Sequence, residues 1–188
     1  MENKKTYTME IAGLKRDLPL CKVNDSLYIA AFVMFGDVEI TIACAKELLK
    51  LAPEYDIMIT AESKGIPLLY EMARQSGADN YILARKGPKV YMQDIVYASV
   101  NSITTLSKQM LCISGEDAEA MRGKRVLIVD DVISTGESIA ALTQLVEQVG
   151  GNIVGKMAVL AEGDAINRKD IIALAPLPVF NPDGTIKE

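Results

Sequence analysis

The stretch VLIVDDVISTGES, residues 126–138, decides how this chain folds. The apolar run Arg125–Asp130 predicts a buried strand that ends in an acid. Residues Thr135–Val149 carry apolar side chains at helical spacing, and Gly150-Gly151 closes that pattern. A buried strand that leads through a short polar loop into a helix indicates a parallel α/β sheet.

The loop that joins this strand to this helix has the composition of an anion site. A helix N-terminus offers unpaired N–H groups and a favourable dipole, and Gly136 lets the backbone approach a phosphate. The hydroxyls of Ser134–Ser138 add further donors. The neighbouring Asp130 and Asp131 would repel a phosphate, so we expect them to bind ribose hydroxyls or a magnesium ion. The loop therefore predicts a ribose 5-phosphate site; the alternative is that both acids merely cap the helix.

Working outward, strands and helices alternate along the chain. Further strands are predicted at 56–61, 81–84 and 153–160, and helices after Asp37 and over Gly65–Gly77. This pattern predicts an α/β fold, a parallel twisted sheet with helices on both faces. Residues 1–36 are expected to be irregular, 89–114 to form a hairpin or mobile loop, and 171–180 to be an edge strand or extended tail.

Ligands of such sheets bind at the carboxyl ends of the strands. Three polar segments follow the predicted strands at those ends, namely Glu62–Gly65, Arg85–Gly87 and Asp130–Ser138. We therefore expect them to meet at one edge of the sheet.

Composition excludes several classes of site. The chain of 188 residues has no histidine, so acid–base work must fall to carboxylates, Lys, Tyr or the substrate. A net charge of −5 and 5% aromatic residues argue against nucleic acid as a partner. Three scattered cysteines fit neither a disulfide framework nor a metal site. The longest apolar stretch, Tyr28–Phe35, is too short to span a bilayer, so we expect a cytoplasmic protein without a membrane partner.

The run Val126–Ser138 resembles the phosphoribosyl pyrophosphate (PRPP) signature of type I phosphoribosyltransferases: an apolar strand, two acids, two apolar residues, then a small-Thr-Gly-x-Ser/Thr loop. The resemblance covers roughly residues 55–165 and implies that Asp130 and Asp131 bind the ribose hydroxyls, with Mg²⁺ held indirectly through PRPP. It assigns the 5-phosphate to the loop formed by Ser134, Thr135, Gly136, Glu137 and Ser138. It also implies the type I phosphoribosyltransferase fold.

That fold would make residues 1–188 a single domain. Residues 1–36 and 161–188 would supply a small N-terminal and C-terminal hood, and residues 88–114 a flexible flap that closes over the reacting centre and excludes water. The same family leads us to expect a homodimer.

The other two polar segments resemble pyrophosphate contacts of the family's purine branch. Glu62-Ser63-Lys64-Gly65 is similar to a loop of adenine phosphoribosyltransferases, which usually have Arg where this chain has Lys64. Arg85 and Lys86, with Lys89 close by, resemble the basic pair that follows the corresponding strand. The alternatives are a helix-starting turn with Ser63 as N-cap and a solvated basic turn.

The base that would accept the ribose is the open point. The segment Ala84-Arg85-Lys86, followed by Ala98–Thr104, looks most like bacterial xanthine enzymes and purine-operon repressors, but xanthine enzymes have a Lys where this chain has Gly163. Hypoxanthine-guanine enzymes have an Asp at the position of Ser134, whereas adenine enzymes have a small residue. Val132, Phe35 and Glu162 are the candidate base contacts.

The resemblance therefore implies purine salvage by a transferase that uses PRPP, with adenine favoured. The alternatives are a xanthine enzyme, a non-catalytic PRPP-sensing regulator and a pyrimidine enzyme of the orotate type. No residue is identified as the catalytic acid or base.

Overall fold

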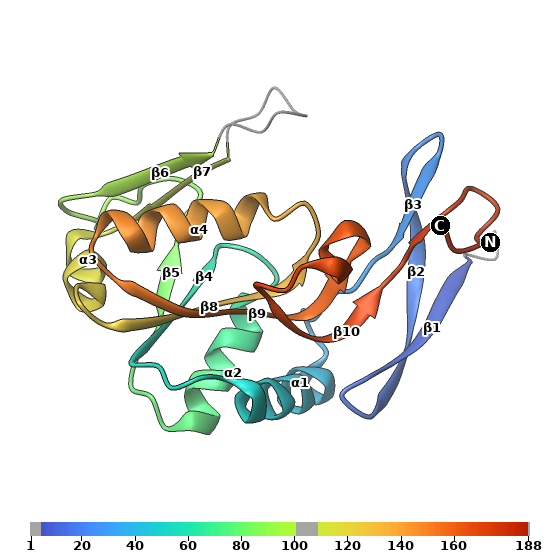
Figure 1. The fold of residues 1–188 in the computed structure, drawn as a ribbon, viewed down its shortest axis with the longest axis horizontal. Helices are drawn as coiled ribbons and strands as arrows, with labels where there is room; N and C mark the ends of the chain where they lie inside the picture. The colour runs from blue at the N-terminus through green and yellow to red at the C-terminus, as the bar shows by residue number, and fades with distance from the viewer. Residues whose placement is uncertain (1–4, 101–108, 188) are drawn as a thin grey trace.

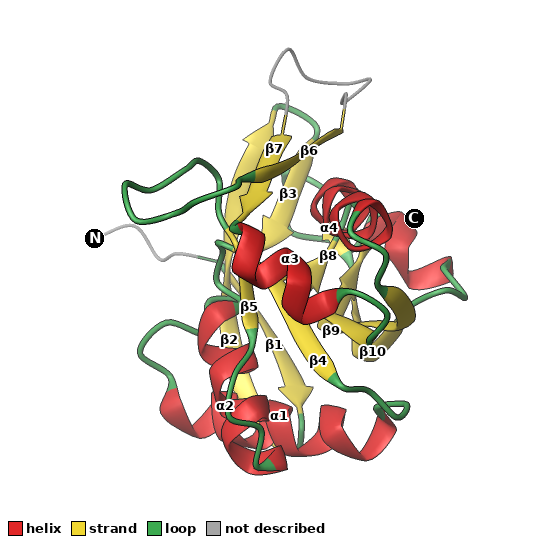
Figure 2. Ribbon diagram, turned by 90° about the vertical axis from the view of Figure 1, so that its left-hand side faces the viewer, coloured by secondary structure: helices red, strands yellow, loops and turns green. Residues whose placement is uncertain are grey.

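The computed structural model describes residues 5–100 and 109–187. Its centre is a sheet of five parallel strands, which Figures 1 and 2 show from two sides. In spatial order the strands are β10 (Ile172–Leu177), β9 (Asn152–Glu162), β8 (Arg125–Ile133), β4 (Ile57–Ala61) and β5 (Ile82–Ala84). The predicted fold class is confirmed.

Helices cover both faces of this sheet (Figure 1). One face packs against α4 (Glu137–Gln148), and the other against α1 (Val38–Leu51) and α2 (Ile66–Ser76). Each face has its own apolar core, and β8 contributes alternate side chains to both. This explains why residues 126–129 are apolar without alternation, since a strand buried on both faces has no solvent side.

Local signals define the helices. Asp37 caps α1 by accepting a hydrogen bond from the Ile40 backbone N–H at 3.1 Å, and Arg16 holds the same carboxylate at 2.7 Å. Helix α2 ends at Gly77, which has the left-handed φ of 74° that favours glycine at a helix C-terminus. The predicted N-cap and helix stop are both confirmed.

The expectation that residues 1–36 are irregular is wrong. The described part of that range, from residue 5 on, forms β1 (Thr6–Ile11), β2 (Leu14–Asn24) and β3 (Leu27–Ala30), which join β11 (Val179–Phe180) in an antiparallel sheet, here called the hood sheet. In β1 the side chains alternate between exposed and partly buried, because one face packs on the core while the other faces solvent. In Figure 1 the hood sheet stands beside the β10 edge of the main sheet.

The expected segment 171–180 divides between the two sheets, since β10 is an edge strand of the main sheet and β11 belongs to the hood sheet. The predicted hairpin is present as β6 (Val96–Val100) and β7 (Gln109–Ile113). Residues 101–108 of the predicted flap, including Asn101–Thr104, lie outside the described residues.

One helix was not expected. The segment after Ser114 forms α3 (Gly115–Met121). Ser114 accepts from the Asp117 backbone N–H, and Asp117 accepts from the Ser114 backbone in return. This capping box compensates for the short length of the helix.

Candidate active site

The three polar segments meet at the carboxyl edge of the main sheet, as the sequence predicts. Ser63, after β4, and Asp130, in β8, lie 67 residues apart in sequence, yet the Ser63 Oγ donates to Asp130 Oδ1 at 3.2 Å. Lys64 Nζ lies 3.1 Å from Asp131 Oδ2. Adjacent parallel strands bring these residues together, because their carboxyl ends share one edge.

β8 continues to Ile133, three residues beyond the predicted end at Asp130, so both Asp130 and Asp131 lie inside the strand. Both are buried, with 5% and 3% of their surface exposed. The Asp131 backbone N–H donates to Asp130 Oδ1 at 2.9 Å. Burial, together with the neighbouring negative charge of Asp131, raises the pKa of Asp130 to about 7. Two buried acids side by side are costly to a fold, which favours a role for them in binding.

Asp131 keeps an unused acceptor. Its Oδ2 atom is buried and has no hydrogen-bond partner among the described residues, although Lys64 lies close by as a counter-charge. Lys64 instead donates to the Phe32 backbone carbonyl at 2.9 Å. A ribose hydroxyl or a metal ion would satisfy such an orphaned oxygen.

Gly65 explains how the turn after β4 approaches this pair so closely. A Cβ atom on Gly65 would lie 2.9 Å from Thr60 Oγ1 and 3.1 Å from Asp130 Oδ1. The Gly65 backbone N–H also donates to Ser63 Oγ at 3.1 Å. Only glycine permits this packing, so the Ser63-Lys64-Gly65 turn does more than start α2.

The basic segment after β5 is also paired with an acid. Arg85 Nη2 lies 3.1 Å from Glu62 Oε1, and the Lys86 backbone N–H donates to Glu62 Oε2 at 3.0 Å. That backbone hydrogen bond, with the charges of Arg85, Lys89 and Lys86, lowers the pKa of Glu62. Glu62 therefore holds the basic segment in place, and the three predicted basic residues lie around its carboxylate.

The loop after β8 has the expected glycine geometry. Gly136 has a φ of 81° and is the N-cap of α4, which begins at Glu137. The expected helix start at Thr135 is thus two residues early. Ser134 and Thr135 are exposed, whereas Glu137 and Ser138 are partly buried. The backbone N–H groups at the start of α4 suit an anion.

Sequence reasoning missed Arg168, which follows the short 3₁₀ helix η1 (Gly163–Asn167). A Cβ atom on Gly136 would overlap Arg168 Nη1 and lie 3.7 Å from Arg168 Cζ, so the guanidinium rests on this glycine. The sequence carries no signal for this contact, because 31 residues separate the pair and no motif includes Arg168.

The three candidate base contacts, Glu162, Val132 and Phe35, differ in burial and in their distance along the chain from the loop after β8. Glu162 ends β9 and is 7% exposed. Burial raises its pKa, while a hydrogen bond from Ser134 and the charge of Lys64 lower it. Glu162 thus lies beside Ser134 of the loop after β8 and close to Lys64 of the turn after β4. Val132 is partly buried against the core, and Phe35 is 57% exposed on the connection from the hood sheet to α1.

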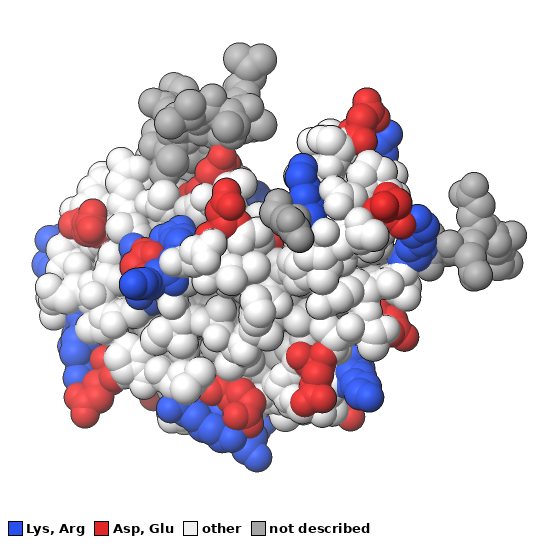
Figure 3. Space-filling model, turned by 45° about the vertical axis from the view of Figure 1, so that its right-hand side comes forward, with Lys and Arg blue, Asp and Glu red and all other residues white. Residues whose placement is uncertain are grey.

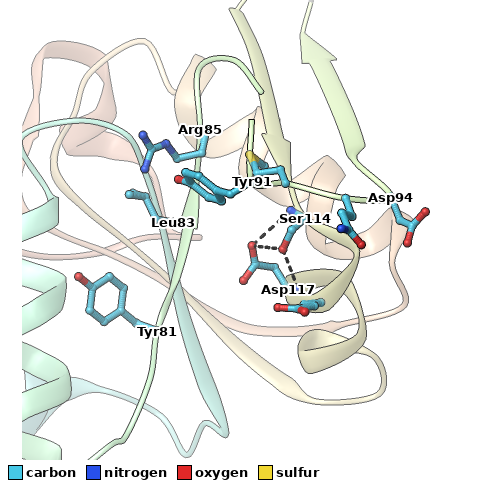
Figure 4. Close-up of a pocket in the computed structure, with 10 residues that line it drawn as sticks. Tyr81, Leu83, Arg85, Tyr91, Asp94, Ser114 and Asp117 are labelled. Carbon is cyan, nitrogen blue, oxygen red and sulfur yellow. Dashed lines mark hydrogen bonds between the residues drawn. The ribbon is translucent and has the colours of Figure 1, made fainter. Parts of the chain in front are cut away.

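A cavity of about 540 Å³ lies beside β5 and not at the loop after β8. Figure 4 shows Tyr81, Leu83, Tyr91 and Asp94 around it, with the Ser114–Asp117 capping box at one side. Of the predicted site residues only Arg85 lines it. Arg85 Nε is buried and without a hydrogen-bond partner in the described part of the chain.

Within residues 5–100 and 109–187, no group of three or more His, Cys, Asp or Glu side chains could hold a metal ion. A magnesium ion at Asp130 and Asp131 would therefore need phosphate or hydroxyl oxygens from a substrate, as is usual for this ion.

Acidic and basic side chains are interspersed on the face seen in Figure 3. None of the described helices has the length and apolar character needed to cross a membrane.

Comparison with known families agrees with this geometry. The model of the phosphoribosyl transferase domain matches residues 39–175. The chain belongs to that family. An adenine phosphoribosyltransferase of Cenarchaeum symbiosum is 32% identical over 138 residues, covering 68% of this chain and 78% of that protein. A xanthine phosphoribosyltransferase of an Exiguobacterium species is 31% identical, covering 63% of this chain and 61% of that protein.

The chain spans about half to three quarters of the length of the curated relatives that it matches. A solved structure confirms the fold: adenine phosphoribosyltransferase from Thermoanaerobacter pseudethanolicus has a TM-score of 0.64 and 20% identity. That superposition covers 92% of this chain and 95% of the other.

Proposed function

We propose that this chain is a purine phosphoribosyltransferase that transfers ribose 5-phosphate from PRPP to adenine, giving a nucleoside monophosphate and pyrophosphate. The observation that carries the proposal is the convergence of an anion-binding loop, two buried carboxylates and the cations Lys64 and Arg85 at one sheet edge. PRPP presents a monophosphate, two ribose hydroxyls and a pyrophosphate, which are the groups that these elements suit.

The donor would bind in three parts. The backbone of Ser134–Ser138 would take the 5-phosphate, since this segment forms the glycine turn and the N-terminus of α4. Asp130 and Asp131 would accept hydrogen bonds from the ribose hydroxyls, and Asp131 Oδ2 has the unused capacity to do so. The segment around Glu62 would present the cations to pyrophosphate.

The acceptor side favours adenine. Glu162 is a buried carboxylate beside Ser134 and can accept hydrogen bonds from a purine N–H or amino group. The same carboxylate would repel an anionic oxopurine such as xanthine. Gly163 supplies no compensating cation, and its φ of 57° favours glycine over a lysine there.

The reaction joins a purine nitrogen to carbon 1 of the ribose as the bond from that carbon to pyrophosphate breaks. The purine loses one proton, and pyrophosphate leaves with the electron pair of the broken bond. Positive charge develops on the sugar, so the carboxylates at the ribose would stabilise the transition state. Most of the acceleration would come from holding donor and base in line.

Magnesium fits the site as part of a PRPP complex. Asp130 and Asp131 would hold it together with PRPP oxygens, and it would neutralise charge on the departing pyrophosphate. We propose further that residues 1–188 act as one domain in a cytoplasmic homodimer, which sedimentation analysis would test.

Pyrophosphate release tests the function. Purified protein with Mg²⁺ and PRPP is offered adenine, guanine, hypoxanthine, xanthine and orotate in separate reactions. Adenine should give the highest kcat/KM. A faster reaction with xanthine would replace the adenine assignment. PRPP binding without turnover of any base would instead favour a PRPP-sensing regulator.

A further inference from the structure

Arg168 is held in an unusual way for a residue at the edge of a binding loop. Its Nε donates to Asp170 Oδ1 at 2.9 Å, and its Nη2 donates to Asp170 Oδ2 at 2.7 Å. This two-pronged pairing fixes the plane of the guanidinium. The remaining terminal nitrogen, Nη1, lies against Gly136.

Asp170, which anchors Arg168, also lies near a second cation. Lys156 Nζ, from β9, lies 3.7 Å from Asp170 Oδ2. Hydrogen bonds from Arg168 lower the pKa of Asp170 to about 2, so Asp170 stays ionised at neutral pH. The trio of Lys156, Asp170 and Arg168 therefore has a net charge of +1 beside the loop.

A positive charge is needed there. Asp130, Asp131 and Glu162 place carboxyl groups close to the loop, and Lys64 already faces Asp131. The dipole of α4 supplies only about half a positive charge at its N-terminus. A dianionic monophosphate at Ser134–Ser138 would thus be poorly compensated without a further cation.

We infer that Arg168 is a positioning residue of the 5-phosphate site: it braces Gly136 from outside the loop and adds a fixed positive charge for a dianionic monophosphate ester. This inference rests on the proposed function. The alternative is that Arg168 and Asp170 form an ordinary surface ion pair, which would contribute little to binding.

Calorimetric titration of the full chain distinguishes a positioning role of Arg168 from an ordinary surface ion pair. Ribose 5-phosphate probes the loop, and magnesium pyrophosphate probes the opposite part of the site. Arg168→Ala should weaken ribose 5-phosphate binding about tenfold and leave magnesium pyrophosphate within about twofold. Arg168→Lys keeps the charge but loses the fork, and Asp170→Asn releases the anchor; each should cost about threefold.

The salt dependence of binding is the readout that a merely structural brace would not move. Affinity for ribose 5-phosphate should fall less steeply with salt in Arg168→Ala than in the wild type, and Arg168→Lys should keep the wild-type slope. Arg122→Ala is the matched control, because Arg122 is also ion-paired to a nearby acid, Glu119, but lies away from the loop. It should change neither affinity.

The inference would be overturned if Arg168→Ala bound ribose 5-phosphate as tightly as the wild type does. It would also be overturned if the substitution weakened the binding of ribose 5-phosphate and of magnesium pyrophosphate equally. If Arg168→Ala does not fold, Arg168→Lys and Asp170→Asn make the same comparison. Failure of the wild-type chain to bind ribose 5-phosphate or PRPP would overturn the proposed function instead, which is a different result.

Discussion

The two ends of the proposed PRPP site are built differently. After β8, the binding groups are backbone N–H groups, whose positions are set by Gly136 and by the first turn of α4. After β4 and β5, they are cationic side chains that already have acidic partners, Lys64 with Asp131 and Arg85 with Glu62. At the first end the backbone fixes the positions of the binding groups, whereas at the second end side chains must exchange ion pairs.

This difference has an energetic consequence. A fixed backbone loop loses little entropy when a phosphate binds. A cation that leaves a carboxylate for pyrophosphate gains only the difference between two pairings, unless another positive charge takes over the carboxylate. The 5-phosphate end should therefore set how well the donor is held, and the pyrophosphate end how binding depends on magnesium.

Asp131, the residue that joins the two ends, should give the largest effect. Asp131→Asn removes the counter-charge of Lys64 and one acceptor for the ribose hydroxyls. We expect kcat/KM for PRPP to fall by at least about 100-fold, since a buried charged hydrogen-bonding group is lost. Steady-state kinetics with adenine measure it.

Asp56→Asn is the control for that variant. Asp56 is also paired with a cation, Arg125, but this pair lies at the opposite edge of the sheet, where β4 and β8 begin. It should leave kcat/KM within about twofold. Unchanged activity in Asp131→Asn would mean that the loop does not bind PRPP as proposed.

Gly136 tests the preformed end alone. Gly136→Ala must adopt a φ of 81° and must displace the Arg168 guanidinium. We expect KM for PRPP to rise about 30-fold, because the loop can no longer keep its N–H groups in position. Gly77→Ala has a similar φ of 74° in open space, so it should cost stability without changing KM. Equal kinetic effects of both substitutions would contradict a preformed loop.

Lys64 tests the end that must exchange partners. Lys64→Ala should weaken inhibition by pyrophosphate about tenfold, and Lys64→Arg should retain it, since Arg can pair with a phosphate through two nitrogens. The measurement is product inhibition at saturating magnesium. Stronger pyrophosphate binding in Lys64→Ala would show that Lys64 serves only to neutralise Asp131.

The same contrast explains what the sequence could predict. The loop after β8 is contiguous, so the strand, the glycine turn and the helix could be predicted from residues 126–138, although the strand ends three residues later and the helix begins two residues later than predicted. The convergence on Glu62 and Asp130 followed from the parallel topology. The identity of each ion-pair partner did not, because it depends on how side chains from separate strands are oriented.

Three features lacked a usable signal or were misinterpreted. Arg168 reaches Gly136 only through the path of the chain after β9, which no motif encodes. The alternation in Thr6–Ile11 was present but was obscured by the polar, turn-rich sequence around it. The Ser114 capping box was likewise present, but α3 is too short for its apolar spacing to be recognised.

The burial of Asp130 could not be predicted from the sequence either, since two acids after an apolar run suggest exposure. This burial leads to the smallest effect that we predict. The folded chain keeps a proton on Asp130 up to about pH 7, whereas the unfolded chain releases it near the ordinary value of 3.8. Between these values the folded state binds more protons, so stability should fall as pH rises from about 4 to 7. Asp130→Asn should remove this loss.

Chemical denaturation at about pH 5 and pH 8 measures it. The stability of Asp130→Asn relative to the wild type should rise by on the order of 1–2 kcal/mol between the two conditions. Asp25→Asn, with a side chain that is 98% exposed, should follow the wild-type curve. Parallel curves for Asp130→Asn and the wild type would mean that Asp130 is already ionised in the folded chain at about pH 5. The acid pair would then be maintained as a charged site before any ligand arrives, and the whole carboxyl edge, not only the loop after β8, would be preformed.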